Sequence, residues 1–217
     1  MLDFYCIELL EKRGTPYAPT IVSEQDLFLA NCIECGRTHF NDANRDLSLI
    51  IEGKRKLPDT LMCGHIPLTI VTSNVIEAWE KHNITGYTSF PIKQLLDLKR
   101  NPIQTEVQYY CVNINGYIEL DFEKMGVQII EICSMCGPNV YSKNIREWGT
   151  AYFKEHTYDG SDLFVPKYFE GVTLCTKRVL KIIYEEKLTN FDFRHYKYMF
   201  GWKIDAPEVN LKELFSK

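Results

Sequence analysis

The sequence lacks the features that mark membrane and secreted proteins. It has no apolar run long enough to cross a membrane, and its first residues carry neither a basic segment nor a long apolar one. We therefore expect a cytoplasmic protein without membrane contacts. Because that compartment is reducing, the eight cysteines do not predict a framework of disulfides.

An excess of basic charge is missing as well. Lys and Arg total 25 against 29 Asp and Glu, for a formal net charge of −4. Binding to phosphate backbones needs a basic surface, so this balance disfavours a nucleic-acid partner. The sequence also shows no Ser/His/Asp or Cys/His constellation, no phosphate-binding glycine loop and no helical His-x-x-x-His pair. We therefore expect a binding protein and not an enzyme.

What the sequence does contain is one short motif in two copies, Cys32-Ile33-Glu34-Cys35-Gly36 and Cys133-Ser134-Met135-Cys136-Gly137. We call each copy a knuckle. Two thiolates three positions apart can bind one ion if the chain turns back between them, and the glycine supplies the left-handed residue of such a turn. Structural zinc has four ligands, so two knuckles predict one structural Zn²⁺ site. Its predicted ligands are Cys32, Cys35, Cys133 and Cys136.

A redox-active dithiol is the alternative explanation of Cys-x-x-Cys. In thiol oxidoreductases the first cysteine lies at a helix N-terminus, where the helix dipole lowers its pKa. Gly36, Gly137 and Pro138 oppose a helix after either knuckle. A thiol-disulfide oxidoreductase is therefore the second hypothesis, and a nucleic-acid-binding zinc-ribbon protein is the third.

Two segments have the period of short amphipathic helices. Val75, Ile76 and Trp79 share one helical face, with Thr72 or Ser73 as the N-cap. The segment 174–183 repeats this pattern, with Thr176 as its candidate N-cap. Strands are expected at 4–10, 47–51, 127–132 and 191–196, and a terminal helix at 209–215.

A β-hairpin is predicted from Thr105 to Phe122. Asn115-Gly116 is typical of a two-residue type I′ turn, and β-forming residues flank it on both sides. In the register that this turn sets, Tyr110 lies beside a row of carboxylates on one face of the hairpin. These carboxylates belong to Glu119, Asp121 and Glu123. Such an acidic row is either an ordinary solvated face or a contact surface for a basic protein partner.

The pattern of elements recurs along the chain. The knuckles are 101 residues apart (Cys32 to Cys133), and the helices are 104 apart (Val75 to Val179). We predict an α+β fold of two related α/β half-domains that arose by internal duplication, with the zinc knuckles joining them into one compact unit. The first half spans 1–100, the second spans 101–205 and includes the hairpin, and 206–217 form a tail. Chance similarity of short amphipathic segments is the alternative.

The two knuckles resemble the bacterial double-CXXCG motif immunity family. Asp46-Leu47-Ser48, Asn83-Ile84-Thr85-Gly86 and the segment 188–194 carry the resemblance further, so that it extends from the first strand to Tyr196. It implies a cytosolic antitoxin without enzymatic activity, whose partner is a cognate polymorphic toxin domain. It also implies that the four knuckle cysteines are the motif residues of the family.

Overall fold

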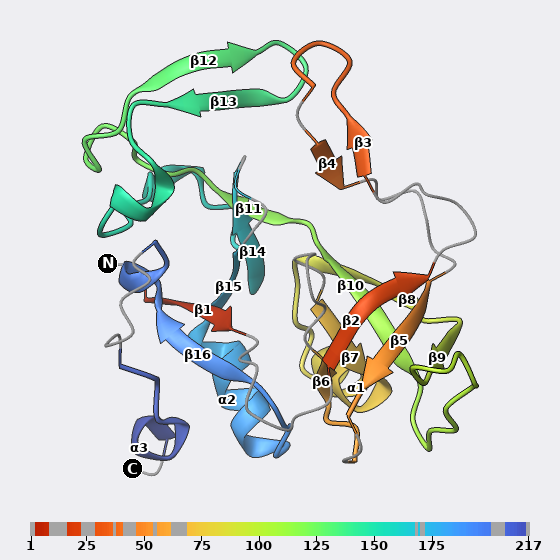
Figure 1. The fold of residues 1–217 in the computed structure, drawn as a ribbon. Helices are drawn as coiled ribbons and strands as arrows, with labels where there is room; N and C mark the ends of the chain where they lie inside the picture. The colour runs from red at the N-terminus through yellow and green to blue at the C-terminus, as the bar shows by residue number, and fades with distance from the viewer. Residues whose placement is uncertain are drawn as a thin grey trace.

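Short strands make up most of the regular structure, and the two longest helices have nine residues each. The computed structural model describes residues 3–8, 17–22, 29–36, 38–40, 47–53, 56–61, 69–167, 169, 172–200 and 207–215. Helices and several separate sheets are mixed along the chain, which confirms the α+β class. Figure 1 shows the sheets and the helices that pack on them.

A four-stranded sheet lies at the right of Figure 1. Its spatial order is β6-β7-β10-β8, and all its neighbouring strands are antiparallel. The strands are β6 (Thr60–Leu61), β7 (Thr69–Thr72), β8 (Tyr87–Pro91) and β10 (Tyr109–Ile114). Helix α1 (Ser73–Lys81) follows β7 directly, so the sheet and the helix form one continuous unit.

A five-stranded sheet lies at the left, in the order β11-β14-β15-β1-β16. Only β11 and β14 are parallel. The strands are β1 (Phe4–Glu8), β11 (Gly116–Ile118), β14 (Leu163–Pro166), β15 (Thr173–Thr176) and β16 (Asp192–His195). Helix α2 (Lys177–Glu185) follows β15, and α3 (Leu211–Phe215) contacts α2. In Figure 1 the red strand β1 therefore lies among the blue strands of the distant second half.

Three smaller sheets complete the described structure. One has the order β2-β5-β9, with β2 (Tyr17–Val22), β5 (Ser48–Glu52) and β9 (Gln94–Leu96). Two others are strand pairs, β3 (Leu29–Asn31) with β4 (Thr38–Phe40), and β12 (Ile129–Cys133) with β13 (Gly137–Tyr141). Three 3₁₀ helices lie in the second half: η1 (Ile145–Glu147), η2 (Glu155–Thr157) and η3 (Tyr196–Tyr198). The two strand pairs hold the knuckles.

Both predicted amphipathic helices are confirmed. Helix α1 buries Val75, Ile76, Ala78 and Trp79, and α2 buries Val179, Leu180, Ile182 and Ile183. These side chains meet in one core cluster together with Val71, Val112 and Leu163. Each buried aliphatic side chain contributes on the order of 1.5–3 kcal/mol through removal of apolar surface from water. The helices are therefore stabilised by packing across the interface between the halves.

Thr72 and Thr176 occupy the predicted N-cap positions, but their side chains make no capping hydrogen bond. The Thr72 hydroxyl donates instead to Oδ1 of Asp59 (3.0 Å), and that of Thr176 donates to Oδ1 of Asp162 (2.9 Å). A threonine hydroxyl can both donate and accept a hydrogen bond, so it can donate to a carboxylate where it does not cap the helix. Here each hydroxyl ties the start of its helix to the residue that directly precedes a strand, β6 for Asp59 and β14 for Asp162.

The expected strands and terminal helix are present with shifted ends. The expected strand 47–51 is β5, 127–132 is β12, and 191–196 is β16, while the terminal helix is confined to Leu211–Phe215. The first strand ends at Glu8. Residues 9 and 10 of that expected strand lie outside the described residues.

The predicted hairpin is wrong. Strand β10 pairs with β7 and β8, whereas β11 pairs with β14 in the other sheet. A type I′ turn needs positive φ at both central residues, and neither Asn115 nor Gly116 is in that region. A Cβ on Gly116 would lie 2.3 Å from the carbonyl oxygen of Leu163. The glycine is therefore needed for close packing against β14, and the chain passes from one sheet to the other at this point.

Candidate metal centre

Each knuckle is a tight turn held by a strand pair. In the first, which follows β3, the N–H of Gly36 donates to the carbonyl of Cys32 (2.8 Å). In the second, β12 and β13 bring Cys133 opposite Gly137. Gly36 has φ 71° and Gly137 has φ 82°. The left-handed glycine predicted for each turn is confirmed.

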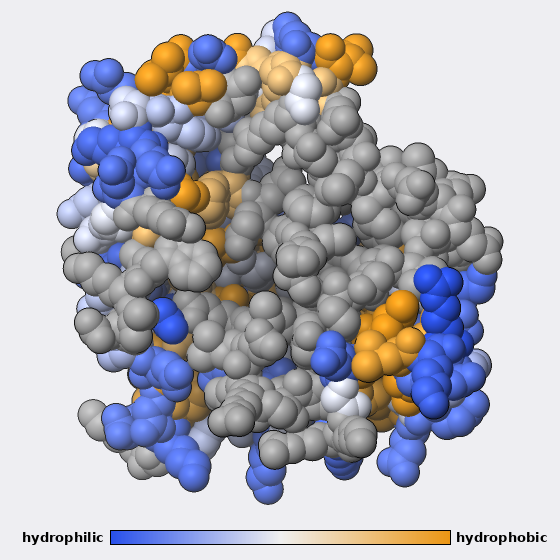
Figure 2. All heavy atoms as spheres, viewed as in Figure 1, coloured by the Kyte–Doolittle hydropathy of each residue, from blue (hydrophilic) through white to orange (hydrophobic). Residues whose placement is uncertain are grey.

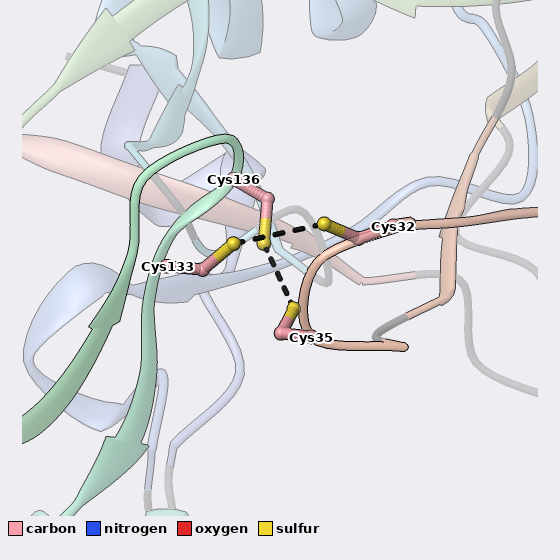
Figure 3. Close-up of side chains that lie close together, drawn as sticks. All are labelled: Cys32, Cys35, Cys133 and Cys136. Atoms are coloured by element: carbon pink, nitrogen blue, oxygen red, sulfur yellow. Dashed lines mark hydrogen bonds between the residues drawn. The ribbon is translucent and has the colours of Figure 1, made fainter.

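The two turns face each other, and their four sulfur atoms form one cluster (Figure 3). The Sγ atoms of Cys32 and Cys133 are 3.6 Å apart, and those of Cys35 and Cys136 are 3.4 Å apart. All four lie within 4.8 Å of one another. A disulfide has an S–S distance of about 2.05 Å, and all four cysteines are free. The structure thus brings together the four predicted ligands, although the two knuckles that carry them are about a hundred positions apart in the sequence.

The spacing of the cluster fits a tetrahedral ion. Zinc–thiolate bonds of about 2.3 Å in a tetrahedron place the sulfur atoms roughly 3.8 Å apart. The contacts of 3.4 and 3.6 Å and the upper limit of 4.8 Å bracket this value. An all-thiolate donor set is soft, which suits zinc among the common divalent ions. The cysteines are therefore compatible with a metal such as zinc.

Electrostatics distinguish the thiols. Hydrogen bonds from the backbone N–H groups of Cys35 and Glu34 lower the pKa of Cys32 to about 7. The Glu34 carboxylate raises the pKa of Cys133, while desolvation and the neighbouring thiol of Cys35 raise that of Cys136. Four thiolates at these distances repel one another, and a bound cation compensates that repulsion. These pKa directions are compatible with a site whose thiols would release protons if a metal ion bound.

Glu34, inside the first knuckle, holds the second. Its Oε2 accepts hydrogen bonds from Cys133 Sγ (2.8 Å) and from the N–H of Met135 (3.1 Å). The hydroxyl of Ser134 donates to both carboxylate oxygens. These contacts lower the pKa of Glu34. Sequence analysis did not single out Glu34, because an internal residue of Cys-x-x-Cys carries no signal of its partner.

The knuckles and the β12–β13 arm expose large apolar side chains. Ile33 is 89% exposed and Met135 is 63% exposed, at the tips of the two turns. Ile130 (61%) and Ile132 (70%) continue this surface along β12. Figure 2 shows apolar side chains gathered over this end of the molecule, at the top. We call these four residues the apolar arm surface.

The structure separates the residues of the predicted acidic row. Tyr110 lies on β10 and packs against the core, whereas the three carboxylates follow β11 in the other sheet. Glu119 forms ion pairs with Lys167 (3.1 Å) and Lys154 (3.5 Å), which lower its pKa. The row therefore does not lie beside Tyr110 on one hairpin face, because the hairpin is not formed.

The other two carboxylates differ from Glu119 in their surroundings. Asp121 forms an ion pair with Lys124 (3.4 Å) and accepts a hydrogen bond from its backbone N–H. Glu123 is exposed. Two of the three acidic groups are thus already compensated by lysines of the same chain.

No protein-family model matches the chain, and no curated protein is similar to it. Among the described residues, no helix is long and apolar enough to span a bilayer. The function must be inferred from the cysteine cluster and its surroundings.

Proposed function

We propose that the protein is a zinc-stapled bacterial immunity protein, which neutralises a cognate toxin by direct binding. The observation that carries this proposal is the convergence of four thiols from two distant turns at a spacing that fits one structural ion. A closed set of four protein ligands leaves no open coordination position for a substrate. Such an ion stabilises a scaffold and performs no chemistry of its own.

The proposed Zn²⁺ joins two related half-domains. Each half supplies one knuckle, with Cys32 and Cys35 from the first and Cys133 and Cys136 from the second. The two knuckle contacts pair equivalent cysteines, which supports an approximate twofold relation between the halves. Structural zinc binding contributes on the order of 10–16 kcal/mol in small zinc peptides, comparable with the stability of a whole domain. Holding the knuckles together is therefore a sufficient role for the ion.

The apolar arm surface supports protein binding. Ile33, Ile130, Ile132 and Met135 are all more than 60% exposed, and neighbouring exposed apolar side chains are typical of protein contacts. We propose this surface as the main toxin contact. The surface predicted from the sequence, Glu119, Asp121 and Glu123 with Tyr110, is the second candidate. Lysines of the same chain pair with Glu119 and Asp121, so it presents less free negative charge to a basic partner.

Co-expression with the toxin encoded beside the gene tests the proposal. We expect survival of the host cell and a purified complex with an interface on the order of 800 Å² per partner. Ile132→Ser should weaken the complex by at least tenfold, whereas Leu98→Ser, at a residue 65% exposed outside the arm, should leave it unchanged. If the host cells die and no complex can be purified, the proposed function is contradicted for that pair.

The two candidate surfaces predict different kinetics. Reversal of Glu119, Asp121 and Glu123 to lysine should slow association if that face steers the toxin, with little effect on dissociation. Ile132→Ser should instead speed dissociation. Surface plasmon resonance separates the two rates, and an unchanged association rate would leave the acidic residues as an ordinary solvated surface.

One observation favours a second function. The pKa of about 7 at Cys32 makes its thiol more reactive than an ordinary cysteine. However, neither knuckle lies at a helix N-terminus, since strands β4 and β13 follow them. Metal-free, reduced protein that catalyses disulfide exchange would support a thiol oxidoreductase. A stoichiometric bound metal with inert thiols would remove that alternative.

A further inference from the structure

The two large sheets have the same arrangement of strands. One has the order β6-β7-β10-β8, and the other contains β14-β15-β1-β16 beyond its edge strand β11. In each, a helix follows the second strand and leads through a turn to the fourth. The third strand of each sheet comes from elsewhere in the chain. It is β10 in the sheet of the first half and β1 in the sheet of the second.

The pairing registers of these two inserted strands are equivalent. Cys111 of β10 lies opposite Ile70 and Phe90, and Cys6 of β1 lies opposite Leu174 and Arg194. The neighbours differ by 104 positions in both cases. The inserted segments themselves read Tyr-Tyr-Cys-Val at 109–112 and Phe-Tyr-Cys-Ile at 4–7. A one-residue slip would turn every side chain to the opposite face, so equal registers place equivalent side chains in both cores.

A pair of hydrogen-bonded latches repeats across the halves. Oδ2 of Asp59 accepts hydrogen bonds from the N–H and the hydroxyl of Thr189 (2.8 and 2.7 Å). Oδ2 of Asp162 accepts the same two hydrogen bonds from Thr85 (3.3 and 3.4 Å). The return bonds repeat as well, because the N–H of Asp59 donates to Thr189 Oγ1 and that of Asp162 to Thr85 Oγ1, both at 3.1 Å. Each latch crosses from one half to the other.

From these observations we infer that the chain is a reciprocally strand-exchanged pair of copies of one unit. Each half lends its first strand to the sheet of the other: β10 lies between β7 and β8, and β1 lies between β15 and β16. This inference rests on the proposed duplication, but on neither the metal nor the toxin. Figure 1 shows both exchanged strands: red β1 on the left and green β10 on the right.

Strand exchange makes the two halves one cooperative unit. Both β1 and β10 are paired along two edges, and their central residues Cys6 and Cys111 are buried. Removing either strand would leave two unpaired edges inside a sheet and open its core. The covalent connection between β9 and β10 is therefore not what holds the halves together.

A cut in that connection tests the inference on the full chain. A protease recognition sequence is inserted between Gln104 and Thr105, both exposed, and is cleaved under native conditions in the metal-loaded protein. We expect both fragments to elute as one particle of unchanged mass and to separate only in denaturant. Fragments that separate under native conditions would overturn strand exchange.

Two controls identify what joins the fragments. Val112→Pro removes a backbone donor in the middle of β10, whereas Thr105→Pro changes an exposed position before it. After cleavage, the dissociation constant of the two fragments should be at least tenfold higher for Val112→Pro than for Thr105→Pro. Equal dissociation would overturn the inference. Separation of the cleaved wild type by a chelator alone would show that the metal joins the halves, which contradicts strand exchange and leaves the metal proposal intact.

Hydrogen exchange on the unmodified chain gives an independent test that needs no folded variant. If the halves hold each other, the amides of Cys6 and Cys111 open in the same global event, with equal protection and equal response to denaturant. Loss of protection in one sheet at a lower denaturant concentration than in the other would show that the halves open separately. That result would overturn reciprocal exchange.

Discussion

At the scale of single residues, the centre depends on thiols and not on the shape of the turns alone. Cys35→Ser replaces one sulfur ligand by a hydroxyl, which is a poor ligand for a soft site. We expect bound metal to fall from one ion per chain to less than a tenth of that value. Met135→Ala, in the other knuckle but without a ligand atom, should keep the metal. Elemental analysis of both purified variants measures the difference, and full metal content in Cys35→Ser would contradict the assigned ligand set.

Glu34 is expected to position the knuckles for metal binding. Its carboxylate accepts hydrogen bonds from the Ser134 hydroxyl and the Met135 N–H of the opposite knuckle, and these remain when Cys133 binds a metal as a thiolate. Loss of such outer contacts typically lowers metal affinity by about 10–100-fold. We expect Glu34→Ala to do so, whereas Glu131→Ala, at an exposed residue of β12, should have no effect. Competition with a chromophoric chelator measures both, and equal affinities would contradict the positioning role.

The sequence predicts the ligands well and their surroundings poorly. The spacing of Cys32 and Cys35, repeated at Cys133 and Cys136, restricts the chemistry to metal or redox use. The left-handed glycines follow from the same turn geometry. By contrast, the role of Glu34 depends on which turn faces it, and this is decided by folding over a hundred residues.

At the scale of elements, two glycines illustrate how closely the halves approach. Gly86 and Gly160 have nearly the same left-handed φ, 88° and 86°. A Cβ on Gly86 would lie 2.0 Å from the carbonyl oxygen of Leu163 in the other half, while one on Gly160 meets nothing within 4 Å. Gly160→Ala should therefore cost about 1 kcal/mol of conformational strain. Gly86→Ala should cost at least twice as much, as measured by urea denaturation, and equal costs would contradict the close contact.

The two aspartate latches should differ in strength. Asp162 is buried and also pairs with Arg178 Nη1 at 3.0 Å, whereas Asp59 is half-buried and accepts hydrogen bonds from Thr72 and Thr189. Removing a buried acceptor leaves its donors unsatisfied, at a cost of about 1–3 kcal/mol. We expect Asp162→Ala to lower the free energy of unfolding more than Asp59→Ala, with exposed Glu123→Ala as the neutral control. The reverse order in denaturant titrations would contradict this reading of the latches.

Local signals predict helices better than strand partners. Helices α1 and α2 satisfy their own backbone hydrogen bonds, so the period of Val75, Ile76 and Trp79 was sufficient to find α1. Strand β10 needs partners chosen by the whole fold. Asn115-Gly116 has the composition of a type I′ turn, yet Gly116 is required by the proximity of Leu163 and Ser161. The sequence alone cannot distinguish a glycine that is needed for close packing from a glycine that is needed for a turn.

At the scale of the whole molecule, metal binding should depend steeply on pH. The pKa values of Cys133 and Cys136 are raised above that of an ordinary thiol, so both carry protons at neutral pH in the metal-free protein. Metal binding releases these protons, and apparent affinity should rise by about 100-fold per pH unit when two are released. Stability conferred by the metal is thus present at high pH and lost as pH falls. Chelator competition between pH 6 and 8 measures how the apparent metal affinity changes with pH. A rise of less than tenfold per pH unit would contradict the release of two protons.

The two amphipathic helices and several of the strands could be predicted from the sequence, but the arrangement of the elements could not. The similar spacings of the knuckles (101 residues) and of the helices (104 residues) predicted two similar halves. They did not indicate that Cys6 and Cys111 lie in sheets formed by the opposite half, because sequence periodicity contains no information about which copy a strand joins. Strand exchange conserves every local pattern and changes only long-range partners.

Metal content with X-ray absorption at the zinc edge tests the central claim most directly. We predict one zinc ion per chain, with four sulfur neighbours at about 2.3 Å and no nitrogen or oxygen ligand. Chain purified without bound metal even when zinc is supplied, or zinc held by fewer than four sulfur atoms, would contradict the account of two knuckles joined by one ion.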